Sequence, residues 1–144
     1  MVDSETKMNK MVKGLPHRYP FILIDRVIEL DPGRRAVAIK GVSLDDFFLS
    51  RHFPQEPCMP EDLVLETLAQ TGGIAMLSAK EGKTGILLKV EKMKFEKRVK
   101  PGSLLKLYAE VEFCFGGMAK VKVRAEVEGE TVAQGILVLA EGNM

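Results

Sequence analysis

His52 and Glu66 are the two side chains of this sequence best suited to exchange protons with a substrate. An imidazole titrates near neutral pH, and a carboxyl group among apolar neighbours can hold its proton at that pH. Three prolines follow His52 within eight residues, and a stiff loop of this kind can position a catalytic group. Glu66 is flanked by Val64, Leu65 and Leu68, where an unpaired carboxylate is costly to bury.

Each of these two residues also has a structural interpretation. A loop histidine can simply hydrogen-bond to the backbone, and a helical glutamate can lie at the one solvated edge of an apolar helix. Gln70 follows Glu66 by one helical turn, so the two side chains share a face and can form a hydrogen bond. The residue types alone therefore indicate an acid–base pair and leave the structural alternative open.

A single helix, predicted over residues 61–79, must carry Glu66 and Gln70. Pro60 suits the first helical position, and the acidic pair at 61–62 matches the partial positive charge of a helix N-terminus. Apolar residues occupy nearly every side of the segment, which is typical of a buried helix. Gly72–Gly73 inside it indicates the close approach of another backbone segment.

The rest of the sequence is typical of β-strands. Strands are predicted over 21–30 and 35–43 before the helix, and over 85–97, 105–115, 119–127 and 131–140 after it. The alternation slips near Val90–Glu91, which predicts a bulge, and Gly116–Gly117 predicts a tight hairpin turn. The odd-numbered residues of 105–115 and 119–127 are expected to face inward, and the last four strands to form a meander.

This order of elements predicts an α+β fold in which an antiparallel sheet of about six strands wraps around one central buried helix. The 144 residues suit a single domain spanning 1–144, with residues 1–14 as a polar N-terminal extension. The helix has more apolar surface than one sheet face should cover, which favours a dimer.

Charge and composition exclude several classes of protein. The 21 basic and 20 acidic residues give a net charge of +1, whereas nucleic-acid binders usually show a clear basic excess. The two cysteines, Cys58 and Cys114, form no CxxC motif, and with two histidines they indicate neither a metal site nor a disulfide framework. No apolar stretch is long enough to span a membrane, and the polar start does not resemble a signal peptide, so a cytoplasmic location is expected.

A basic cluster precedes the predicted turn at Pro101–Gly102. It consists of Lys94, Lys97, Arg98 and Lys100. Such a cluster is either an ordinary solvated surface or a docking patch for an acidic partner.

Several short motifs together resemble those of a known family. They are Leu15 to Phe21, Asp25-Arg26, His52-Phe53-Pro54, Pro57, Met59-Pro60, Leu65-Glu66 and Ala69-Gln70. In this combination they resemble the 3-hydroxyacyl-[acyl-carrier-protein] dehydratases of fatty acid synthesis, in the FabZ branch that carries Glu at the helix position. The resemblance extends from about residue 13 to residue 140, and the fourteen-residue step from His52 to Glu66 matches the catalytic pair of that family.

The resemblance implies a hot-dog fold and a mechanism. His52 would remove the C2 proton of a (3R)-3-hydroxyacyl thioester, and Glu66 of the other subunit would protonate the departing hydroxyl group. Gln70 would support Glu66, and the backbone N–H of Glu61 would polarise the thioester carbonyl. The product would be a trans-2-enoyl thioester, with no metal or other cofactor.

The resemblance also implies partners. The substrate would be linked to the phosphopantetheine arm of acyl carrier protein, an acidic protein that the cluster Lys94, Lys97, Arg98 and Lys100 would contact. The enzyme would be a homodimer or a trimer of dimers, and neither nucleic acid nor a membrane span is expected.

Three positions depart from the family pattern, since Arg51, Gln55 and Glu61 stand where the family usually has glycine. Two alternatives to the dehydratase therefore remain. One is a hot-dog acyl-thioester hydrolase, and the other is a non-catalytic paralogue that binds acyl thioesters.

Overall fold

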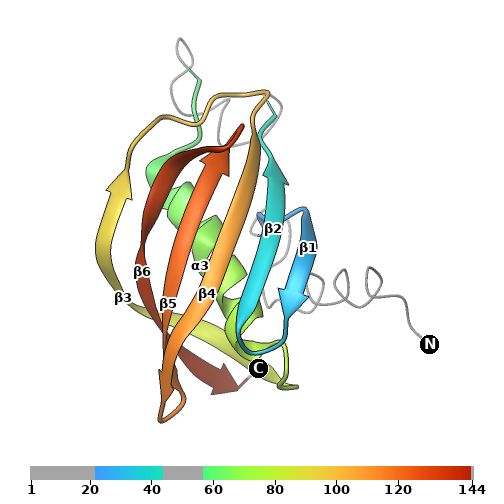
Figure 1. Cartoon of the computed structure of the whole chain (residues 1–144), viewed down its shortest axis with the longest axis vertical. Helices are drawn as coiled ribbons and strands as arrows, with labels where there is room; N and C mark the ends of the chain where they lie inside the picture. The colour runs from blue at the N-terminus through green and yellow to red at the C-terminus, as the bar shows by residue number, and fades with distance from the viewer. Residues whose placement is uncertain (1–21, 44–56, 144) are drawn as a thin grey trace, which may run out of the picture.

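A computed structural model describes residues 22–43 and 57–143 of the chain. Its elements are β1 (Arg26–Asp31), β2 (Arg35–Gly41), α3 (Glu61–Leu77), β3 (Lys83–Phe95), β4 (Leu104–Phe115), β5 (Met118–Val127) and β6 (Glu130–Asn143). The strands form one curved antiparallel sheet of six strands, and α3 lies against one of its faces (Figure 1). The predicted α+β arrangement around a central helix is confirmed.

The strand order is β1-β2-β4-β5-β6-β3, which shows that the predicted meander of the last four strands was wrong. Only β4, β5 and β6 follow one another, because β3 pairs with β6 at the far edge of the sheet. The chain returns from that edge through residues 96–103, and hydrogen bonds from Val42 N–H to Ser103 O and from Gly102 N–H to Val42 O fasten this return to the end of β2. The Pro101–Gly102 turn therefore directs β4 to β2 instead of back along β3.

Helix α3 ends at Leu77, two residues before the predicted end, and its second half is buried on every side. The side chain of Leu68 is fully buried against the sheet. Thr67 and Thr71 are also fully buried, and each hydroxyl group donates a hydrogen bond to a backbone carbonyl of the preceding turn. Buried polar groups thus have partners inside the helix, as stability requires.

Glycines on both elements, Gly72 of α3 and Gly85 of β3, allow α3 to lie close to the sheet. A methyl group added at Gly72 would come within 3.0 Å of Leu139 Cδ1 and 3.6 Å of Val121 Cγ1. A methyl group added at Gly85 of β3 would lie 3.4 Å from the Cα of Gly73. The expected close approach of another backbone segment is therefore found between Gly73 and Gly85.

The β4–β5 hairpin confirms one prediction and corrects another. Gly116 and Gly117 both have positive φ, 57° and 76°, as a two-residue hairpin turn requires. The register shifts between Val111 and Phe113, however, so Phe113 and Phe115 do not face inward as predicted and are 63% and 73% exposed. A residue added to the pairing turns every later side chain to the opposite face.

Strand β3 is irregular on both sides of the predicted bulge. Its pairing with β6 shifts between Leu87 and Lys89 and again between Glu91 and Lys94, and Lys92 has a φ of 52°. At the second shift Met93 packs closely on Gly135 of β6. A methyl group added at Gly135 would lie only 2.9 Å from the Cα of Met93.

The two helical glycines provide a matched test of the packing of α3. Gly73→Ala meets no described atom within 4 Å, so it should stabilise the protein by up to about 1 kcal/mol through helix propensity. Gly72→Ala drives a methyl group into buried Leu139 and should lie about 1–2 kcal/mol below Gly73→Ala in free energy of unfolding. Urea denaturation of both variants measures this difference, and equal stabilities would contradict the packing described for Gly72.

Candidate active site

The carboxyl group of Glu66 is held by Gln70, as the spacing predicts. Glu66 lies on the second turn of α3 and is half-buried, whereas Gln70, one turn later, is buried. Gln70 Nε2 donates a hydrogen bond of 3.2 Å to Glu66 Oε1. The pair is therefore formed within the helix, independently of any substrate.

A backbone group fixes the direction in which Gln70 presents its amide. The N–H of Leu23 donates a hydrogen bond of 3.1 Å to Gln70 Oε1. Because this N–H can only donate, the carbonyl end of the amide must face Leu23 and the NH₂ end must face Glu66. Glu66 thus meets a donor, which orients its carboxyl group within the site.

Asp25 in turn holds the segment that contains Leu23. Its carboxylate accepts a hydrogen bond of 2.7 Å from the N–H of Gly41 and lies 3.7 Å from Lys40 Nζ, and its own N–H donates to Ile39 O. Residues 22–25 are thereby fastened to β2 beside α3. Sequence reasoning assigned no role to Leu23 or Asp25; the only signal was the place of Asp25 in the family motif.

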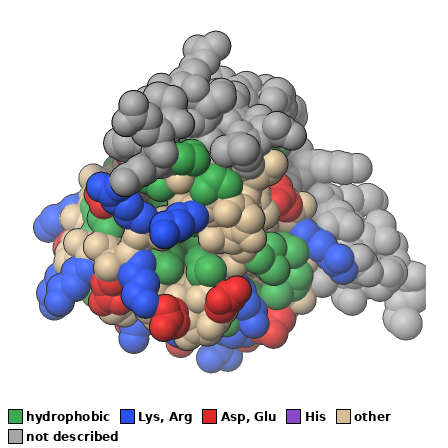
Figure 2. Space-filling model, turned by 90° about the horizontal axis from the view of Figure 1, so that it is seen from above, with side chains coloured by type: hydrophobic (Ala, Val, Ile, Leu, Met, Phe, Trp, Pro, Cys, Tyr) green, Lys and Arg blue, Asp and Glu red, His purple; other side chains and the backbone are tan. Residues whose placement is uncertain are grey.

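A hollow of about 520 Å³ lies beside the first turn of α3. Its apolar walls come from the segment before α3, the end of β3 and the start of β6. Figure 2 shows this end of the molecule, where Lys, Arg and acidic side chains lie beside hydrophobic ones. The lining residues are Cys58, Met59, Pro60, Glu61, Asp62, Val64, Phe95, Lys97, Arg98, Val99, Val132 and Ala133. Met59 N–H donates to Val99 O at 2.8 Å, which ties the entry of the helix to the segment after β3.

The backbone at the start of α3 suits a developing negative charge. Pro60 O accepts the N–H groups of Leu63 and Val64, whereas the N–H groups of Glu61 and Asp62 have no acceptor among the described residues. The first N–H groups of a helix lack intrahelical partners and attract anions. Glu61 has no positive φ, so the side chain that stands here in place of glycine brings no backbone strain.

Of the predicted catalytic pair, only Glu66 lies within the described residues. Glu66 and Gln70 are together, but His52 lies outside the described residues, as do Arg51 and Gln55. The partnership of His52 with Glu66 therefore stays a prediction.

The four residues of the basic cluster do not lie together in the structure. Lys97 and Arg98 line the hollow beside α3, Lys94 lines a different hollow on the opposite side of the sheet, and Lys100 is exposed near the Pro101 turn. Lys97 also donates a hydrogen bond to Glu130, and this ammonium group lowers the pKa of the Glu130 carboxyl below its usual value. At neutral pH Lys97 is therefore already paired.

The described residues contain neither a cluster of metal ligands nor a membrane-spanning helix. No group of three or more His, Cys, Asp or Glu side chains that could hold a metal ion is found within residues 22–43 and 57–143. Over these ranges, α3 is neither long nor apolar enough to be a membrane-spanning helix.

Comparisons with known proteins match most of the chain. Residues 15–136 match the family described as a FabA-like domain. The 3-hydroxyacyl-[acyl-carrier-protein] dehydratase FabZ of Ruminiclostridium cellulolyticum is 47% identical over 130 residues, covering 88% of this chain and 92% of that protein. FabZ of Listeria monocytogenes is 43% identical over 135 residues, covering 92% and 94%.

Solved structures agree at the level of the fold. The dehydratase heterocomplex ApeI:P from Xenorhabdus doucetiae has a TM-score of 0.76 at 21% identity, covering 92% of this chain and 91% of that chain. A hypothetical thioesterase with coenzyme A from Streptococcus pneumoniae has a TM-score of 0.66 at 12% identity, covering 83% and 86%. These likenesses confirm the hot-dog fold.

Gln70→Leu should destabilise the protein, although leucine is similar in size and apolar. The substitution leaves the Leu23 N–H without its acceptor and Glu66 without this donor, which should lower the free energy of unfolding by about 1–3 kcal/mol. Urea denaturation measures the loss. Gln70→Glu is the comparison, because it keeps an acceptor for Leu23 but replaces the donor to Glu66 by a second carboxyl group that faces it, so activity should fall as well. A fully stable Gln70→Leu variant would contradict this role.

Proposed function

Because the chain belongs to the FabA-like family, we propose that it is a 3-hydroxyacyl-[acyl-carrier-protein] dehydratase of fatty acid biosynthesis. The observation that carries this conclusion is the identity of 47% to a FabZ dehydratase over nearly the whole length of both chains. The reaction removes the C2 proton and the C3 hydroxyl group of a (3R)-3-hydroxyacyl thioester. Its products are water and the trans-2-enoyl thioester.

Two residues exchange the protons in this mechanism. His52 takes the proton from C2 as general base, and Glu66 of the other subunit gives a proton to the departing 3-hydroxyl group. The hydrogen bond from Gln70 to Glu66 Oε1 supports this role, since it fixes the direction of the carboxyl group. Proton transfer is efficient only when donor and acceptor are held within hydrogen-bonding distance.

The thioester carbonyl would lie at the start of α3. As the C2 proton leaves, negative charge grows on the carbonyl oxygen, and the backbone N–H of Glu61 would stabilise it by a hydrogen bond. The N–H groups of Glu61 and Asp62, which have no acceptor within residues 22–43 and 57–143, support this assignment. The side chains of Glu61 and Asp62 are exposed and line the rim of the hollow.

The substrate is carried by acyl carrier protein, whose acidic surface would meet the basic cluster of Lys94, Lys97, Arg98 and Lys100. The hollow beside α3, with its apolar walls and with Lys97 and Arg98 at its rim, supports a path for the acyl arm from that end of the molecule. A cytoplasmic location remains part of the proposal.

A homodimer built on strand β3 is the oligomer that the fold supports best. Among the strands of residues 22–43 and 57–143, β3 pairs with β6 alone and leaves a thirteen-residue edge. Leu87 and Val90 pair with Leu139 and Leu137, which are buried in the core, yet each is 38% exposed. A long apolar edge of this kind requires a cover, and a second β3 supplies one by extending the sheet.

The activity is tested by incubating the protein with a (3R)-3-hydroxyacyl thioester and following three products. A dehydratase yields the conjugated enoyl thioester, a hydrolase yields free thiol, and a binding protein yields neither. His52→Ala and Glu66→Ala should each lower the turnover to enoyl product at least about 100-fold, the usual contribution of one positioned acid or base. Circular dichroism checks that each variant is folded, and normal turnover by folded His52→Ala would exclude it as the base.

The dimer is tested on the edge of β3. The double variant Leu87→Glu with Val90→Glu places four charges in a two-fold interface and should give a monomer in light scattering at micromolar concentration. Leu104→Glu is the matched control, because Leu104 is 56% exposed but lies on β4, and it should remain dimeric. A wild-type protein that is monomeric and fully active would contradict the shared site.

A further inference from the structure

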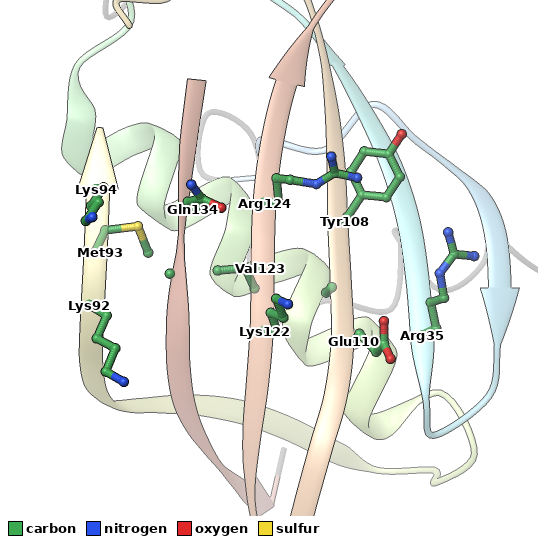
Figure 3. A pocket seen from close by; sticks show the side chains of 12 residues that line it. Arg35, Lys92, Met93, Lys94, Tyr108, Glu110, Lys122, Val123, Arg124 and Gln134 are labelled. Atoms are coloured by element: carbon green, nitrogen blue, oxygen red, sulfur yellow. The ribbon is translucent and has the colours of Figure 1, made fainter. Parts of the chain in front are cut away.

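The face of the sheet that turns away from α3 carries a wide hollow lined with cations. It has a volume of about 920 Å³, and Arg35, Lys92, Lys94, Lys122 and Arg124 line it with a single carboxylate, Glu110. Along β5 the alternate residues Val121, Val123 and Ala125 are buried, so Lys122 and Arg124 point to the opposite side. Figure 3 shows these side chains in front of the sheet with α3 behind it.

Cross-strand pairing aligns the members of this cationic face. Arg124 stands between Tyr108 of β4 and Gln134 of β6, and Gln134 pairs in turn with Lys94 of β3. The guanidinium group of Arg124 lies 4.3 Å from the centre of the Tyr108 ring and 3.0 Å from Glu126. Arg124 is thus held in place with its charge directed along the face.

Three of the lysines are available to a partner. Arg35 is paired with Glu29 at 2.7 Å, but Lys92, Lys94 and Lys122 make no hydrogen bond or ion pair with any described residue. Lys122 stands opposite Glu110 of β4 without forming an ion pair with it, so an anionic partner can still pair with all three ammonium groups. In a chain with a net charge of only +1, this face is a local concentration of positive charge.

The width of the cationic face indicates the kind of partner. The cations come from β2 and β3, the outer two of five neighbouring strands, and from β5 in the middle. With about 4.8 Å between neighbouring strands, β2 and β3 are about 19 Å apart. One small anion cannot touch charges so far apart, whereas an acidic surface helix, about 10–12 Å across with its side chains, can lie over several of them.

The face also reaches the end of the molecule where the proposed active site lies. Lys94 lines the hollow on this face, and the next residue, Phe95, lines the hollow beside the start of α3. Figure 1 shows the end of β3 beside the start of α3. A partner docked over Lys94 therefore lies beside the end of β3 that separates the two hollows. A flexible arm can pass around this end to reach the proposed site.

We propose that acyl carrier protein docks with its acidic surface on this outer face, across Lys92, Lys94 and Lys122, and delivers its acyl arm around the end of β3. This inference rests on the proposed function, which supplies the partner. It moves the centre of docking from Lys97, which Glu130 already neutralises, to lysines without such a partner.

The test compares Lys122→Glu with a control of equal charge change, Lys83→Glu, at the opposite end of β3. At low salt Lys122→Glu should raise KM for carrier-bound substrate about threefold, the scale of one exposed ion pair. Lys122→Arg should restore it, and Lys83→Glu should leave it unchanged. The effect should fade at about 0.5 M salt and be absent for a short pantetheine thioester. Equal effects of Lys122→Glu and Lys83→Glu, or an equal effect on both substrates, would overturn the proposal.

Direct binding separates this inference from the proposed activity. If no enoyl product forms from any substrate, the dehydratase assignment fails, but calorimetric titration with acyl carrier protein still reports on the outer face. Weaker binding by Lys122→Glu than by Lys83→Glu supports the docking surface, and equal binding overturns it. Tighter binding of a DNA duplex than of the carrier protein would also overturn it, because the face would then serve a nucleic acid.

Discussion

The burial of α3 against the sheet is the constraint on which the rest of this structure depends. Leu68 and the apolar residues around it are buried in the core. Burial of each such side chain contributes about 1.5–3 kcal/mol to the free energy of unfolding. Glycine at position 72 leaves room for this contact, since an added methyl group would come within 3.0 Å of Leu139 Cδ1. Once the helix is packed, Gln70 lies beside the segment before β1 and Glu66 lies one turn before Gln70. The carboxyl group is thus placed by packing and aligned by the Gln70 amide, whose own direction the Leu23 N–H decides.

Elements with strong local signals could be predicted from the sequence. The helix is apolar on nearly all sides, and the hairpin at Gly116–Gly117 requires two residues of positive φ, so both were predicted with only small errors at their ends. The contact of Gln70 with Glu66 was also predictable, because a spacing of four residues on a helix determines neighbourhood. The family motif added what no local pattern contains, namely the prediction that His52 acts together with Glu66.

Features that depend on distant parts of the chain could not be predicted in this way. The place of β3 beside β6 follows from the helix crossing to the far edge and from the fastening of Gly102 and Ser103 to Val42. The outward turn of Phe113 and Phe115 follows from one register shift that the alternation of residue types does not reveal. Lys94 and Lys97 are only three residues apart, but β3 ends between them and they line different hollows. A cluster in the sequence is therefore not a cluster in the structure.

Strand β3 combines three demands that an ordinary strand cannot meet at once. Met93 and Phe95 pack against the core, Lys92 and Lys94 belong to the cationic face, and Leu87 and Val90 make the free edge apolar. A regular strand presents only two alternating faces, and every residue must obey the same register. The two register shifts release β3 from this rule, since they let Leu87 and Val90 face the core side while Lys92 and Lys94, only two residues apart around Met93, line one hollow. Gly135 on β6 makes the second shift possible by leaving room for Met93. The irregularity of β3 therefore lets one strand contribute to the hollow beside α3, to the free edge and to the cationic face. The proposed docking surface and the proposed path of the acyl arm consequently meet at the end of β3.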